Sequence, residues 1–118
     1  LRVVDLRLGE GPVFDQLARR LVARDSGRPF GVMNQGLGGN RILYDLRGDS
    51  GLRRFDRDVL AQPGVTHAVV MLGTNDLRNR VARLEQEATA EKIIAGMRQM
   101  ALWARYQVYR RDIDPVWK

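Results

Sequence analysis

Two short loops hold the residues best suited to chemistry. The first spans residues 34–41 and is rich in glycine and asparagine, and the second is Gly73-Thr74-Asn75-Asp76. A glycine lets a ligand approach the backbone with no Cβ in the way, and a carboxamide donates a hydrogen bond without titrating. The same residue types also form tight turns and helix caps. The position of the loops relative to the strands and helices is therefore needed to distinguish a chemical role from a purely structural one.

Hydrophobic periodicity predicts an alternation of strands and helices around these loops. Residues 1–8 alternate loosely and predict a short strand, and residues 12–24 form an amphipathic pattern that opens with a proline, as helices often do. Residues 66–72 form a continuous segment rich in β-branched side chains, with an apolar run over residues 68–72, which predicts a strand buried on both faces of a parallel sheet. The other predicted elements are a strand over 30–33, a helix from about 51, a long helix over 89–106 and a short strand over 106–109.

This order of elements indicates an α/β fold. Alternating strands and helices form parallel sheets joined by right-handed crossover helices. Functional residues in such sheets gather at the carboxyl ends of the strands. Each of the two loops directly follows a predicted strand, so both are expected to open on the same edge of the sheet.

The two loops and the stretch between them resemble the second and third sequence blocks of the SGNH (GDSL-type) ester hydrolases. Segments such as Arg54-Phe55-Asp56-Arg57-Asp58 and Pro63-Gly64-Val65-Thr66-His67 share the likeness, which runs from about residue 14 to residue 101. The resemblance implies a flavodoxin-like three-layer α/β/α sandwich with a short parallel sheet. It also implies a single domain over residues 1–118 that is incomplete at both ends.

The resemblance assigns roles to individual residues. Gly39 would offer its backbone N–H, and Asn75 its carboxamide, to the oxyanion of an acyl-transfer intermediate. Binding residues would be Asn34, Gly38, Asn40 and Asp76, with Asp76 flanking the site and the two asparagines pinning the glycine loop through side-chain-to-backbone bonds. The family cleaves small-molecule acyl or acetyl esters and uses neither metal nor cofactor.

The family's nucleophile and base are not found in this sequence. The family places a serine in a Gly-Asp-Ser block after the first strand and a histidine in an Asp-x-x-His block near the C-terminus, whereas this chain has two serines and one histidine. Ser50 copies the serine block but follows the glycine loop, where an N-cap of the next helix is expected. Ser26 lies in a turn. His67 begins the strand that leads to Asn75, so the two lie roughly 25 Å apart, too far for a triad base.

Composition excludes several other classes. The net charge of +6 invites a nucleic-acid interpretation, but the eighteen arginines are scattered and many adjoin acids, which indicates solvated helix faces. No apolar run reaches the roughly 20 residues of a membrane span, and the first residues lack a signal-peptide pattern. The absence of cysteine excludes disulfides and thiolate metal sites.

The glycine loop also fits neither GxGxxG from Gly36 nor a P-loop, which needs a lysine. Compartment and oligomeric state are not indicated.

Three function classes follow from the sequence. The first is an SGNH-type hydrolase sequence, cut or frame-altered at its ends, that keeps oxyanion-hole elements without a triad and is inactive as this chain. The second is a non-catalytic module of the same fold that binds an acyl or carbohydrate ligand or a partner. The third, an arginine-rich nucleic-acid binder, ranks last.

Overall fold

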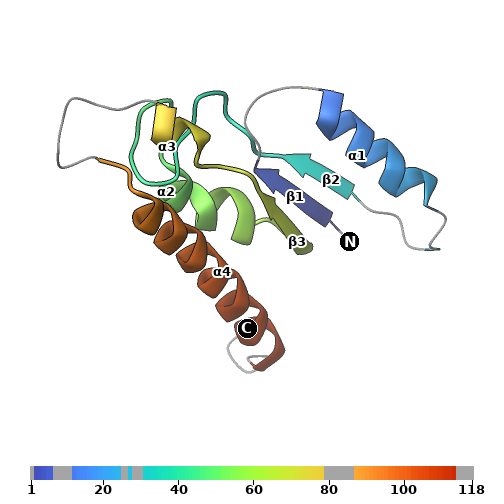
Figure 1. Cartoon of the computed structure of the whole chain (residues 1–118). Coiled ribbons are helices and arrows are strands. Elements are labelled where there is room, and N and C mark those ends of the chain that lie inside the picture. Colours follow the sequence, from blue (N-terminus) through green and yellow to red (C-terminus); the bar gives the residue numbers. More distant parts are fainter. Residues whose placement is uncertain (1, 7–11, 25–26, 28–30, 79–86, 114–118) are drawn as a thin grey trace.

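A three-stranded parallel sheet forms the centre of the fold. The computed structural model describes residues 2–6, 12–24, 27, 31–78 and 87–113. The strands are β1 (Arg2–Leu6), β2 (Gly31–Asn34) and β3 (Val65–Val70), in the order β2-β1-β3 (Figure 1). The helical segments are α1 (Pro12–Ala23), α2 (Gly51–Phe55), the π-helical η1 (Asp56–Leu60), α3 (Thr74–Arg78) and α4 (Ala90–Ile113). The predicted α/β class is therefore confirmed.

The strand register brings the ends of β2 and β3 to one edge of the sheet. Asp5 of β1 pairs with Asn34 on one side and with Val69 on the other. Neighbouring strands lie about 4.8 Å apart, so the tips of β2 and β3 are separated by about 10 Å, with β1 between them. Both candidate loops leave the sheet at this edge (Figure 1). The prediction that they open on the same edge is confirmed.

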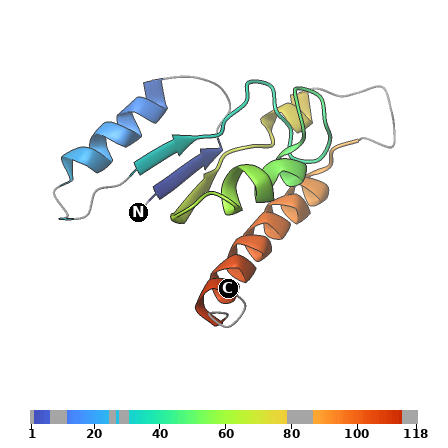
Figure 2. The ribbon, with the colours of Figure 1, turned by 180° about the vertical axis from the view of Figure 1, so that it is seen from behind.

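The helices lie on two sides of the strands. In views from opposite directions, α1 lies beside β2, whereas α2, η1 and α4 lie on the β3 side (Figures 1 and 2). The main hydrophobic core lies on the β3 side, and its buried members are Ile42, Phe55, Val59, Leu60, Val65, Leu72 and Met100. Gly96 allows α4 to approach closely, because a Cβ at this position would lie 2.8 Å from Cγ2 of Ile42.

Strand β3 differs from its prediction. The sequence predicts burial on both faces over residues 66–72, but the strand ends at Val70, and Thr66, His67, Ala68 and Val69 are exposed. Only Val65 of this strand belongs to the core, against which Val70 packs in part. The core residues of η1 and α4 belong to one cluster with Ile42, Phe55 and Leu72, and residues 66–69 of β3 lie outside this cluster. The apolar run therefore predicted the existence of the strand correctly and its burial incorrectly.

The predicted strand over residues 106–109 is also wrong, since these residues lie within α4. Aromatic and β-branched residues favour strands only weakly when the surroundings decide otherwise. No glycine or proline stands between Gly96 and Pro115, so nothing in the sequence breaks the helix there. The helix predicted over 89–106 therefore continues to Ile113. Among the described helices, none has both the length and the hydropathy that a membrane span requires.

Candidate functional site

A tight turn presents the backbone amide of Gly39. The Asn40 N–H donates to the Leu37 carbonyl at 3.1 Å and closes a four-residue turn around Gly38 and Gly39. Gly39 has φ of +80°, the value at the third position of a type II turn, where glycine is favoured. Within the described part of the chain, the Gly39 N–H has no protein acceptor. This half-buried amide can therefore donate to a ligand.

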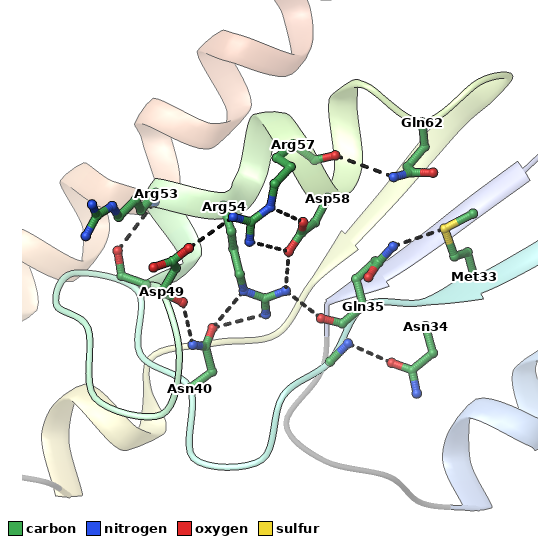
Figure 3. A network of polar contacts seen from close by, with 12 residues as sticks. Met33, Asn34, Gln35, Asn40, Asp49, Arg53, Arg54, Arg57, Asp58 and Gln62 are labelled. Carbon is green, nitrogen blue, oxygen red and sulfur yellow. Dashed lines mark hydrogen bonds and ion pairs between the residues drawn. The ribbon is translucent and has the colours of Figure 1, made fainter.

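Asn40 holds this turn through its side chain. The residue is fully buried, and its Nδ2 donates to the carbonyls of Arg47 at 3.1 Å and Asp49 at 2.8 Å. Its Oδ1 accepts two hydrogen bonds from Arg54 (Figure 3). At the start of the loop, Asn34 Oδ1 accepts from the Gly36 N–H at 2.8 Å. Both asparagines thus make the type of side-chain-to-backbone bond that the sequence predicts for them.

Arg54 is a site residue that the sequence did not reveal. Its guanidinium is buried and donates to Asn40 Oδ1 at 3.0 and 3.2 Å, to the Gln35 carbonyl at 2.7 Å and to Asp58 at 3.2 Å (Figure 3). A buried charge is tolerated only when it is paired and hydrogen-bonded. Arg54 therefore fixes the glycine loop at two points. Its i,i+4 spacing to Asp58 was the one available signal, and such pairs are common on exposed helix faces.

The second loop contacts the first through two side chains. Asn75 Nδ2 donates to the Asn40 carbonyl at 3.2 Å. Asp76 is buried, and its two carboxylate oxygens accept from the N–H groups of Ile42 at 2.8 Å and Leu43 at 3.0 Å. The short helix α3 begins directly after the loop that follows β3, which delivers both side chains to this edge. Asp76 consequently anchors the backbone directly after the glycine loop.

The structure places the second predicted oxyanion donor, Asn75, in contact with the residue that follows the first, Gly39. The Asn75 carboxamide contacts the residue that follows Gly39, and consecutive Cα atoms are about 3.8 Å apart. Gly38 and Gly39 also line a surface depression of about 510 Å³ with Leu46 and Arg47. A carboxamide has two N–H groups, so Asn75 can hold the loop and still donate to a ligand. Neutral N–H donors fixed in this way stabilise negative charge developing on an oxygen atom.

The remaining serine and histidine candidates have other surroundings. Ser50 is the N-cap of α2, and its side chain accepts from the Arg53 N–H at 3.4 Å, as the sequence predicts. His67 lies in the amino-terminal half of β3, in register with Val3, and its Nδ1 is 2.8 Å from Thr66 Oγ1. Ser26 is outside the described residues. Among the residues that are described, no cluster of three or more His, Asp or Glu side chains could hold a metal ion.

Charge around the glycine loop is arranged in ion pairs. Hydrogen bonds from the Ser50 N–H and from Arg53 lower the pKa of Asp45 below its usual value. The Asp58 carboxylate has a lowered pKa because Arg57, and then Arg54, donate hydrogen bonds to it. The pKa of Arg57 is raised by the same contact and by Asp49. These shifts favour the charged forms of both carboxyl groups, whereas a general acid or base for neutral pH needs a pKa near 7.

Comparison with known proteins identifies the family. No curated protein matches the chain. The sequence model of the GDSL-like Lipase/Acylhydrolase family matches residues 6–116, a wider span than the 14–101 over which the sequence resemblance was predicted. The match includes the glycine loop, the Asn75-Asp76 loop and all the helices named above. The chain therefore belongs to the GDSL-like Lipase/Acylhydrolase family.

Proposed function

We propose that the chain binds the carbonyl oxygen of a small-molecule acyl or acetyl ester between the Gly39 N–H and the Asn75 carboxamide. This pair would be the oxyanion hole of its family. The observation that supports the proposal is the hydrogen bond from Asn75 Nδ2 to the Asn40 carbonyl, which ties the carboxamide to the residue after Gly39; the Gly39 N–H itself has no protein acceptor among the described residues.

The rigidity of the loop supports this role. An oxyanion hole acts through donors that are already in place, so that no reorganisation is needed when charge develops. The Gly39 turn is held by Asn40, which is held in turn by Arg54, and Asp76 fixes the backbone two residues further on. Both donors are neutral and keep their N–H groups at any ordinary pH.

Binding without turnover follows from the residues that are missing. Acyl transfer in this family needs a serine nucleophile and a histidine base. The only described serine is a helix cap, and the only histidine of the chain lies within β3. We therefore infer that this chain retains ester recognition and lacks triad chemistry. A three-layer α/β/α sandwich would be the parent fold, supported by the parallel β2-β1-β3 sheet with helical segments following its strands.

Hydrolysis of p-nitrophenyl acetate tests the missing chemistry. The chain should release p-nitrophenol no faster than its Asn75→Ala variant, because no serine nucleophile or histidine base of the described residues lies at the two donors. Ser50→Ala is the matched serine control and should also leave the rate unchanged. A rate that Ser50→Ala abolishes would contradict the proposal.

Amide NMR tests ester binding directly. Titration with methyl acetate should shift the Gly39 N–H resonance, and Asn75→Ala should weaken the apparent affinity, because a hydrogen-bond donor to the ligand is lost. Gln62→Ala removes a carboxamide outside the two loops and should have no effect. An unmoved Gly39 resonance, or equal responses in both variants, would refute the oxyanion site.

A further inference from the structure

The depression beside Gly39 contains a cationic side chain that the proposed function does not use. Arg47 lines it together with Gly38, Gly39 and Leu46. The stem of Arg47 packs directly on Gly39, since a Cβ built there would be 2.8 Å from Cγ of Arg47 and 3.6 Å from its Cδ. The backbone of Arg47 is fixed as well, because its carbonyl accepts from Asn40 Nδ2 at 3.1 Å. The arginine is therefore tied to the turn that presents the Gly39 amide.

The acids around this depression already have partners. Asp45 pairs with Arg53 at 2.6 Å, and Asp49 pairs with Arg57 at 3.0 Å. Asp58 pairs with Arg54 and Arg57, and Asp76 accepts two backbone N–H groups. Arg47, which is exposed, has no carboxylate partner within the described residues. An exposed positive charge with no carboxylate partner among the described residues thus lies against the turn that presents the neutral Gly39 N–H.

We propose that Arg47 binds a carboxylate carried by the ester whose carbonyl oxygen lies at Gly39 and Asn75. The proposal rests on the proposed function and narrows its substrate class to esters of acidic molecules. A guanidinium binds a carboxylate through two parallel hydrogen bonds. The depression, at about 510 Å³, has the size of a small-molecule site. The half-exposed side chain of Leu46 offers an apolar surface for the carbon atoms that link the two groups.

A matched pair of ligands tests the proposal on the full chain. Amide NMR titrations at low salt compare para-acetoxybenzoate, which carries a carboxylate, with its neutral methyl ester. We expect the carboxylate ligand to bind about tenfold more tightly, in line with one charge-assisted contact. Arg47→Gln should remove this preference and leave the affinity for the methyl ester unchanged. Arg98→Gln, a matched exposed arginine on α4, should change neither affinity.

The variants separate failure of this proposal from failure of the proposed function. If Asn75→Ala weakens both ligands while Arg47→Gln changes neither, the carboxylate site is refuted and ester binding stands. If Arg47→Gln removes the preference while Asn75→Ala changes neither affinity, the carboxylate site stands and the oxyanion hole is refuted. Equal affinities of the wild-type chain for the two ligands overturn the carboxylate site, and no saturable binding of either overturns both.

Discussion

Side-chain burial differs between two regions of the molecule, the segment from the end of β2 through α2 and the strand β3. The loop and α2 together bury the polar side chains of Asn40, Arg41 and Arg54, all at 1% exposure or less, and these side chains make hydrogen bonds. Strand β3 exposes Val69 at 38% together with Thr66, His67 and Ala68. A fully bonded buried polar network specifies a single geometry, whereas an exposed strand is held mainly by backbone pairing. The side-chain positions of this molecule are therefore fixed more firmly in the candidate site than in the sheet.

The largest expected effect is at Arg54. Replacement by methionine keeps the size of the side chain but leaves Asn40 Oδ1 and the Gln35 carbonyl without their donors. We expect a loss of about 3 kcal/mol in the free energy of unfolding, measured by urea denaturation.

Arg53 supplies the matched control for this change. Its guanidinium is exposed and pairs with Asp45, so Arg53→Met should cost at most about 1 kcal/mol. Similar losses in the two variants would break the contrast between the buried network and the surface. Arg54→Lys restores the charge without the planar donor geometry and should recover only part of the loss.

A smaller effect is expected from acid. Asp58 has a lowered pKa in the folded chain because Arg57 and Arg54 donate to it, so the folded state binds fewer protons than the unfolded state. Its contribution is therefore fully present above its ordinary pKa of 3.8 and is lost as pH falls through the lower folded value. The free energy of unfolding, measured by urea titration over a pH series, should decrease in this window. In the Asp58→Asn variant, the free energy of unfolding should decrease less as pH falls. Asp56 is an exposed neighbour, so Asp56→Asn should show the same decrease as the wild-type chain. Identical pH profiles for the two variants would count against the Arg57–Asp58–Arg54 contacts.

The smallest effect is expected on the outer face of α4. Leu102 is 57% exposed, so Leu102→Gln should change the free energy of unfolding by less than about 0.5 kcal/mol. Met100, two residues earlier, is 2% exposed, and Met100→Ala should cost about 2–3 kcal/mol. Thermal denaturation followed by circular dichroism compares the two. A loss at Leu102 as large as that at Met100 would show that this face is covered in solution.

Much of the fold could be predicted because its signals are local. The pattern after Pro12 gives α1, and Ser50 before Gly51 gives the start of α2. The placement of both loops at one sheet edge followed from the alternation of strands and helices, and the strand register confirms it. The oxyanion roles of Gly39 and Asn75 remain predictions that the experiments above address.

The rest depended on contacts between distant residues. Asp76 meets the Ile42 N–H across 34 positions, and Arg54 meets Asn40 across 14, separations that no periodicity encodes. Arg54 stands in a run of alternating charges that is usual for a solvated helix, so its burial had no local sign. The exposure of β3 could not be predicted either. An apolar run indicates a preference for burial, but it does not determine which other elements pack against the strand.

The missing side chain at Gly96 determines how α4 is oriented. This helix carries apolar residues on both its buried and its exposed faces, so its pattern alone permits several rotations about the helix axis. Only a residue without a Cβ fits against Ile42 and Leu43, at 2.8 and 3.3 Å from the position a methyl would take. Turning the helix by one residue would drive Ala95 or Met97 into that contact. Steric exclusion at one point, and not amphipathicity, therefore selects the rotation of α4 and with it the residues that face Ile42 and Leu43.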